Sequence, residues 1–156
     1  MCSAAKCVYM LQVVMFLLCG CAGNRGEELV LAASDGDLPT VRRLLDQGVN
    51  VESRALDDLT PLKAAAKKGR LDVVQLLIAR GASINAGTED DDTPLAIAAI
   101  YNHTEVATFL LAHGGRLRGT PASNQDLLQS LKTKHNEQLY ILVRNEIQKE
   151  RAAHVD

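Results

Sequence analysis

Apolar positions between residue 28 and residue 118 repeat with a period of 33 residues. A leucine, a pair of alanines and a second leucine recur in that order, with a glycine or asparagine between them and a glycine at the end. The aligned sets are Leu29/Leu62/Leu95, Ala32/Ala65/Ala98, Ala33/Ala66/Ala99, Gly36/Gly69/Asn102, Leu44/Leu77/Leu110, Gly48/Gly81/Gly114 and Val51/Ile84/Leu117. A fixed period of this length is typical of stacked supersecondary units rather than of one closed core.

Each unit predicts two helices joined by a tight turn. Thr60 and Thr93 are each followed by proline, which is the pattern of a helix start, because the hydroxyl caps the helix and proline needs no hydrogen-bond partner in the first turn. Gly69 and Asn102 lie at the turn, where both residue types tolerate the left-handed region. We therefore expect an all-α solenoid with units at about residues 27–59, 60–92 and 93–118.

The first unit lacks the Thr-Pro pair, as a terminal unit of a stack can. After a short tether at residues 21–27, we expect its first helix at residues 28–34. Asp37 is expected to cap the second helix, with Pro39 in its first turn.

These units resemble the ankyrin repeat family over roughly residues 28–118. The Thr-Pro-Leu start, the double alanine, the turn glycine and the Gly-Ala-x-Ile-Asn exit at residues 81–85 carry the resemblance. The family usually has histidine after Thr-Pro-Leu, whereas Lys63 and Ala96 stand there in this chain. The resemblance implies a non-catalytic surface that binds other proteins through the connector tips and the concave helices.

The segment after residue 118 predicts a helical cap over the last unit. Leu127, Leu131, Leu139 and Val143 recur at mostly helical spacing, and a solenoid needs a capping element with a polar outer face. Two arrangements are open: a degenerate fourth unit with helices near residues 124–134 and 137–151, or one long helix across the end of the stack.

An apolar run at residues 8–18 precedes the repeats and is interrupted by Gln12. A transmembrane helix needs about 20 apolar residues, so this run is too short to cross a bilayer. Its length, together with Lys6 before it, fits the apolar core of a secretory signal peptide.

The Leu-Cys-Gly-Cys sequence at residues 18–21 resembles the lipobox of bacterial lipoproteins. The resemblance implies removal of residues 1–20 and attachment of several acyl chains to Cys21, which anchors a protein to a membrane permanently. By the same resemblance, Ala22 at the second mature position implies the outer membrane. An uncleaved anchor and ordinary cleavage after Gly23 are the alternatives.

Composition and charge exclude several classes of function. The net charge of -2 argues against a nucleic-acid partner, which needs a basic surface. Every cysteine lies within the first 21 residues, so the repeats can hold no disulfide and no cysteine-based site. His103, His113, His135 and His154 lack metal-ligand spacing, and no nucleophile–base constellation is present. We expect no cofactor and no catalytic activity.

The two residues before each turn are the first candidate binding surface, because they lie on or near the concave face of an ankyrin stack. They change from Ser34 and Asp35 to Lys67 and Lys68, and then to Ile100 and Tyr101. Tyrosine is favoured at binding hot spots, since it brings a large contact area with few rotatable bonds. The alternative is that Ile100 and Tyr101 pack against the C-terminal segment.

The acidic connectors are the second candidate. They carry Asp57 and Asp58 in one connector and Glu89, Asp90, Asp91 and Asp92 in the next. A solvated connector, a contact with a basic partner and a calcium site are all open, although the spacing of an EF-hand is missing.

We therefore expect a monomeric, lipid-anchored scaffold that binds another protein in the bacterial cell envelope, facing the periplasm. An immunity protein that neutralises a secreted effector enzyme there is the alternative, since inhibition requires only that the scaffold covers an active site.

Overall fold

The computed structural model of the chain describes residues 25–55, 58–87, 93–118, 120–134 and 136–153. The described residues form helices joined by turns and loops, with no strand among them. The helices are α2 (Arg25–Asp35), α3 (Leu38–Asp46), α4 (Pro61–Lys68), α5 (Leu71–Ala79), α6 (Pro94–Ile100), α7 (Thr104–Ala112), α8 (Pro121–Thr133) and α9 (Glu137–Ala153). The prediction of an all-α fold is confirmed.

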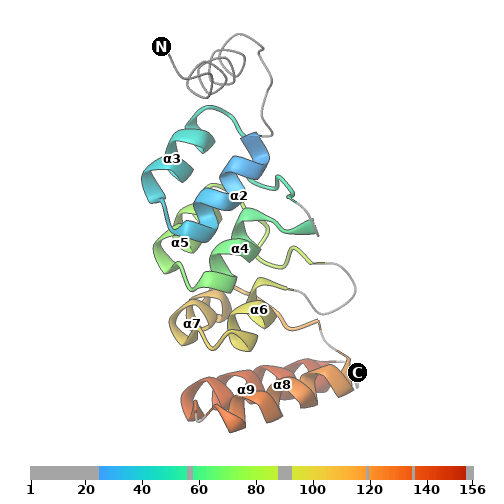
Figure 1. Cartoon of the computed structure of the whole chain (residues 1–156). Coiled ribbons are helices and arrows are strands. Elements are labelled where there is room, and N and C mark those ends of the chain that lie inside the picture. Colours follow the sequence, from blue (N-terminus) through green and yellow to red (C-terminus); the bar gives the residue numbers. More distant parts are fainter. Residues whose placement is uncertain (1–24, 56–57, 88–92, 119, 135, 154–156) are drawn as a thin grey trace, which may run out of the picture.

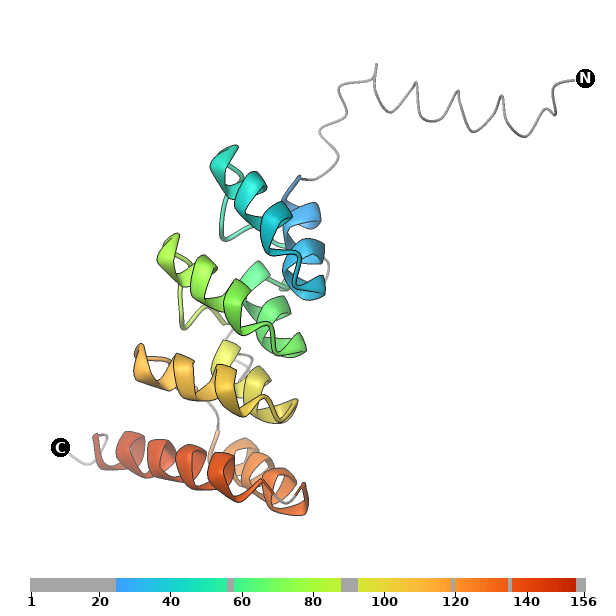
Figure 2. The same ribbon diagram turned by 90° about the vertical axis from the view of Figure 1, so that its left-hand side faces the viewer.

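The helices form four antiparallel pairs that stack in one direction, from α2 and α3 at one end to α8 and α9 at the other (Figures 1 and 2). The first helices of the pairs pack on one another in one row, α2 on α4, α4 on α6 and α6 on α8. The second helices form a parallel row in the same order. Each pair therefore packs mainly on its neighbours, as the 33-residue period predicts.

Threonine starts each of the later pairs. Thr60, Thr93 and Thr120 adopt extended backbone conformations, and each hydroxyl accepts a hydrogen bond from the backbone N–H three residues later, at 3.2–3.3 Å. The carboxylate of Asp37 does the same for α3, accepting from the N–H of Thr40 at 3.1 Å. These caps satisfy N–H groups that have no partner inside the helix, so they fix where each helix begins.

Small residues set the distance between neighbouring pairs. Ala33, Ala65, Ala66, Ala98 and Ala99 are completely buried, and alanine has no side chain beyond Cβ to hold the helices apart. The leucines of the second helices fill the layer beside them: Leu44, Leu77 and Leu110 are at most 1% exposed. The core is therefore a continuous column of repeated positions rather than one central cluster.

The first helix begins earlier than predicted. The sequence placed a tether up to residue 27, but α2 begins at Arg25. Glu27 and Glu28 lie in its first turn, where negative charge stabilises the positive end of a helix, and this extends α2 towards the N-terminus.

The C-terminal segment forms two helices, so the arrangement as one long helix is wrong. Its buried residues Leu131 and Val143 keep the 33-residue period with Ala98 and Leu110. Both helices are longer than predicted, because α8 begins at Pro121 and α9 continues to Ala153. The segment is a fourth unit of the stack with lengthened helices.

Candidate functional site

The first helices of the pairs all end at one edge of the stack, which we call the turn edge and define by Ser34, Asp35, Lys67, Lys68, Ile100, Tyr101 and Lys134. The sequence predicted the first six of these residues as a candidate surface. Ile100 and Tyr101 are each 48% exposed, which is high for large apolar side chains in a chain whose leucines are mostly buried. Leu31 is another large exposed apolar residue, with 60% of its surface exposed, and it lies one turn before Asp35 on α2.

Two of the predicted residues are in direct contact. The Nζ atom of Lys67 lies over the ring of Tyr101, 5.5 Å from its centroid. A cation over an aromatic face is worth about 0.5–1 kcal/mol at an exposed site. This contact crosses from α4 to the end of α6, so it restricts the orientation of an otherwise exposed tyrosine.

The backbone of the turn edge is held by side chains from the next pair. Arg70 Nε donates to the carbonyl of Ser34 at 3.3 Å, and the His103 ring nitrogen Nε2 donates to the carbonyl of Lys67 at 3.0 Å. Lys134 Nζ donates to the carbonyl of Ile100 at 2.5 Å. The three acceptors are spaced by 33 residues, so each unit caps the C-terminal end of the preceding first helix.

Asn136 fastens the fourth unit to this edge. Its side-chain Nδ2 donates to Asn102 Oδ1 at 2.8 Å and to Thr104 Oγ1 at 2.7 Å, while its Oδ1 accepts from the N–H of Leu139 at 3.0 Å. Neither Asn136 nor Lys134 was predicted from the sequence as a residue of this edge. The signal was available, since they lie one period after His103 and Tyr101.

The alternative from the sequence was that Ile100 and Tyr101 pack against the C-terminal segment, but both side chains are 48% exposed. Ile100 lines a crevice of about 320 Å³ between α6 and α8, together with Leu117 and Leu127. Tyr101 does not line this crevice. Ile100 therefore faces this crevice beside the C-terminal unit, and both Ile100 and the Tyr101 ring are exposed.

The acidic connectors are described only in part. Asp58 is exposed, has a positive φ of 56° and forms an ion pair with Arg54 at 3.1 Å. Asp57, Glu89, Asp90 and Asp91 lie outside the described residues.

The neighbouring connector residues are tied together from unit to unit. Glu52 Oε1 accepts from the N–H of Ser83 at 2.7 Å, and Asn85 Oδ1 accepts from the N–H of Arg116 at 2.7 Å. Glu52 and Asn85 are again one period apart, so the connector side of the stack has its own repeated hydrogen bond.

The histidines in the described part of the chain serve the helix ends. His103 is half-buried, and its ring is hydrogen-bonded to the carbonyl of Lys67 at the end of α4. His113 Nδ1 donates to the carbonyl of Phe109 at 2.8 Å and its ring lies 4.0 Å from the Phe109 ring. No group of three or more histidine, cysteine, aspartate or glutamate side chains among the described residues could hold a metal ion.

Cys21, the predicted lipidation site, lies outside the described residues. In the part of the chain that the structure describes, each helix is too short or too polar to cross a bilayer.

Comparison with protein families agrees with this architecture. A family model described as ankyrin repeats (3 copies) matches the chain over residues 1–88 and again over residues 29–120. Domains of this type are typically non-catalytic binding modules. No curated protein matches the chain in a sequence comparison.

Proposed function

The chain belongs to the ankyrin-repeat family, and we propose that it is a non-catalytic, monomeric scaffold that binds one partner protein through the turn edge. The observation that carries the proposal is Tyr101, a half-exposed aromatic side chain held in place by Lys67 from the neighbouring unit. A large side chain that is already ordered loses little entropy when a partner covers it.

The charged and aromatic side chains differ from unit to unit along the turn edge, and this order favours one orientation of a bound partner. Lys67, which lies over the Tyr101 ring, and Lys68 after it are exposed. Asp35 is exposed one period before Lys68, in the first unit. A partner that places an apolar side chain on Tyr101 and carboxylates beside the lysines matches this order. Charge pairs at the rim of such a contact act mainly on association rate and orientation.

Capture of the partner tests this function. The whole tagged chain, its Tyr101→Ala variant and its Ile141→Ala variant are expressed in the native cell and isolated in mild detergent. Ile141 is 46% exposed on α9, so its replacement removes a similarly exposed side chain away from the turn edge. Loss of a hot-spot tyrosine costs about 2 kcal/mol, so Tyr101→Ala is expected to retain at least about tenfold less of the partner than the other two chains.

Equal capture by all three chains would show that the partner binds elsewhere. If the captured partner is a secreted enzyme, an activity assay with the parent chain decides whether the scaffold neutralises it. If the chain is an immunity protein, the parent chain is expected to inhibit the enzyme and the Tyr101→Ala variant is expected to inhibit it less.

For the location, our proposal is that Cys21 carries the lipid and holds the scaffold at the bacterial outer membrane, facing the periplasm. The short apolar run at residues 8–18 and the Leu-Cys-Gly-Cys sequence after it support this location. α2 begins at Arg25, so the tether between the lipid and the first helix would be only a few residues long.

Metabolic labelling with a palmitate analogue tests the lipid anchor. The parent and the Cys19→Ser variant are expected to take up the label and to remain with the membrane fraction, because Cys19 lies upstream of the expected cleavage. Cys21→Ser is expected to lose the label. Equal labelling of Cys21→Ser would rule out this anchor and would leave the scaffold function untouched.

A further inference from the structure

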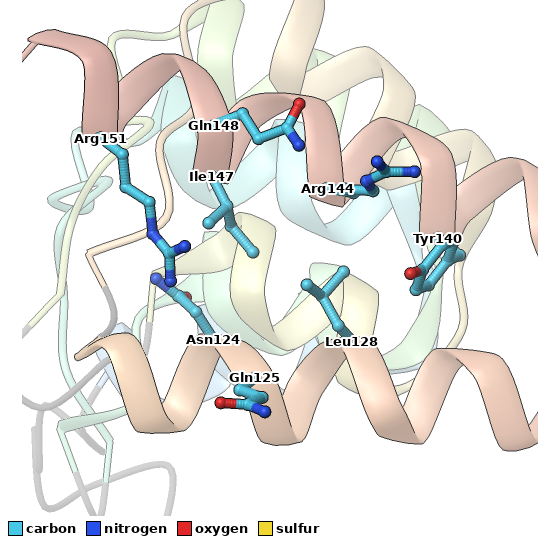
Figure 3. Close-up of a pocket in the computed structure, with 8 residues that line it drawn as sticks. All are labelled: Asn124, Gln125, Leu128, Tyr140, Arg144, Ile147, Gln148 and Arg151. Carbon is cyan, nitrogen blue, oxygen red and sulfur yellow. The ribbon is translucent and has the colours of Figure 1, made fainter.

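The outer end of the stack carries a groove that the proposed scaffold function does not use. It has a volume of about 310 Å³ and runs between α8 and α9. Figure 3 shows Ile147 and Leu128 pointing towards one another from the two helices, and Arg151 extending from α9 towards Asn124 on α8. The groove lies on the C-terminal unit, at the opposite end of the stack from α2 (Figures 1 and 2).

The groove is built largely from helical turns that the other units lack. α6 and α7 have 7 and 9 residues, whereas α8 and α9 have 13 and 17. In register with the third unit, the fourth would begin its first helix at residue 127 and end its second at residue 145. Asn124 and Gln125 precede this range, and Gln148 and Arg151 follow it. Asn124 also lines the crevice that faces the third unit, whereas Gln125, Gln148 and Arg151 do not line it.

The lining combines an apolar floor with cationic and amide rims. Leu128, Tyr140 and Ile147 form the apolar part, and Arg144 and Arg151 contribute guanidinium groups. The residues that line the groove include no carboxylate, and the ion pairs within the described part of the chain do not involve either guanidinium. The chain as a whole has a net charge of -2, so this positive pair is a local feature.

Arg144 distinguishes the surface of the terminal unit from the corresponding surface of the three units before it. The residues one, two and three periods earlier are Leu111, Ile78 and Leu45, and all of them pack against the apolar core. The terminal unit replaces this apolar position by an exposed arginine. A cap that only needs a polar outer surface would not require a second arginine two helical turns further along the same groove.

We propose that this groove binds an acidic amphipathic helix of a partner protein. Arg144 and Arg151 are seven residues apart on one helix, which places them about 10 Å apart along the axis of α9. A helix that lies in the groove matches this spacing with carboxylates two turns apart. An aliphatic side chain between them meets Leu128, which lies beside the largely buried Ile147. A helix in an apolar groove is a common mode of peptide recognition.

Charge favours this occupant over a second copy of the chain. A symmetric dimer through this end would bring each groove, with its two arginines, against the same groove of the other copy. The groove also lies on different helices from Tyr101 and Lys67, so it can bind independently of the turn edge.

Binding of designed helical peptides tests the proposal. The probes are alanine–glutamine helices with one leucine between two glutamates that are three, seven or eleven residues apart, and the target is the full chain in mild detergent. The seven-residue spacing is expected to bind at least about tenfold more tightly than its glutamine counterpart, because each lost charge pair weakens the contact. Exchange of both arginines, Arg144→Gln and Arg151→Gln, is expected to remove this difference.

Lys149→Gln is the matched control, since its side chain is 78% exposed on the same helix and does not line the groove. It is expected to bind as the parent does. Absence of binding at every spacing, equal binding of the glutamine peptides or unchanged binding by the arginine variant would each overturn the proposal. Circular dichroism verifies that the double variant is folded. The single variants Arg144→Gln and Arg151→Gln each remove one of the two charges, and their peptide binding is compared with that of the parent in the same way.

Discussion

His103 lies at the junction of two neighbouring units and contacts the end of one and the turn of the other. Its Nε2 donates to the carbonyl of Lys67, and its ring fills the space beside Gly69. Gly69 has a φ of +69°, and a Cβ built on it would lie 2.5 Å from His103 Nδ1. The glycine is therefore required twice, once for its backbone conformation and once for the close approach of the ring.

Gly69→Ala is expected to destabilise the fold more than Gly81→Ala. Both glycines have positive φ, which costs an alanine about 1 kcal/mol, but Gly81 has open space where the methyl group would lie. The steric contact with His103 raises the expected cost at Gly69 to about 2 kcal/mol or more. Chemical denaturation measures both free energies of unfolding.

A double variant isolates the steric part of this cost. In a His103→Ala background, Gly69→Ala is expected to cost no more than Gly81→Ala does, because the ring is gone. Equal costs at Gly69 and Gly81 in the parent chain would show that His103 does not determine the packing of this turn.

Asp37 gives a pH-dependent contribution at the start of α3. Its hydrogen bonds with Thr40 hold the pKa of the carboxyl below its ordinary value of 3.8. A depressed pKa means that the stabilisation is present above about pH 4 and is lost as the pH falls through the lower pKa of the folded state. Asp37→Asn is therefore expected to reduce the fall in stability between pH 5 and about pH 2. Parallel denaturation curves for the parent and the variant measure this difference, and identical pH dependence would contradict the assignment.

The elements of the three repeats could be predicted from the sequence, whereas the lengths of the two helices in the fourth pair could not. The helix starts at Thr60 and Thr93, the turn at Asn102 and the buried positions of the repeats followed from the period, because each is a local rule repeated at fixed spacing. The lengths of α8 and α9 did not follow, since their extra turns have no counterpart in the repeats. The contact between Lys67 and Tyr101 was also missed, because it joins positions 34 rather than 33 residues apart.

The packing of α9 on α7 predicts a contrast between two of its apolar residues. Leu139 is completely buried, whereas Ile141 is 46% exposed. Leu139→Ala is expected to cost about 2–5 kcal/mol through lost burial and the cavity left behind. Ile141→Ala is expected to change the free energy of unfolding by less than about 0.5 kcal/mol. Thermal and chemical denaturation compare the two variants, and similar costs would mean that α9 does not pack as described.

At the scale of the whole molecule, the chain is a stack in which hydrogen bonds between units repeat along two sides. The turn edge is held by Arg70, His103 and Lys134, and the connector side by Glu52 and Asn85. Because these bonds join only neighbouring units, the stack fixes the backbone of the turn edge while leaving its side chains free to differ. Lys67 and Tyr101 are two of these variable side chains, and the proposed binding function depends on them.

Photo-crosslinking inside the cell tests that function most directly. A photoreactive phenylalanine analogue replaces Tyr101 in one chain and Gln75, an exposed residue of α5, in another. Irradiation is expected to join the chain to one discrete protein from position 101 and not from position 75. The absence of an adduct at position 101, or the same adducts from both positions, would contradict a binding role for the turn edge.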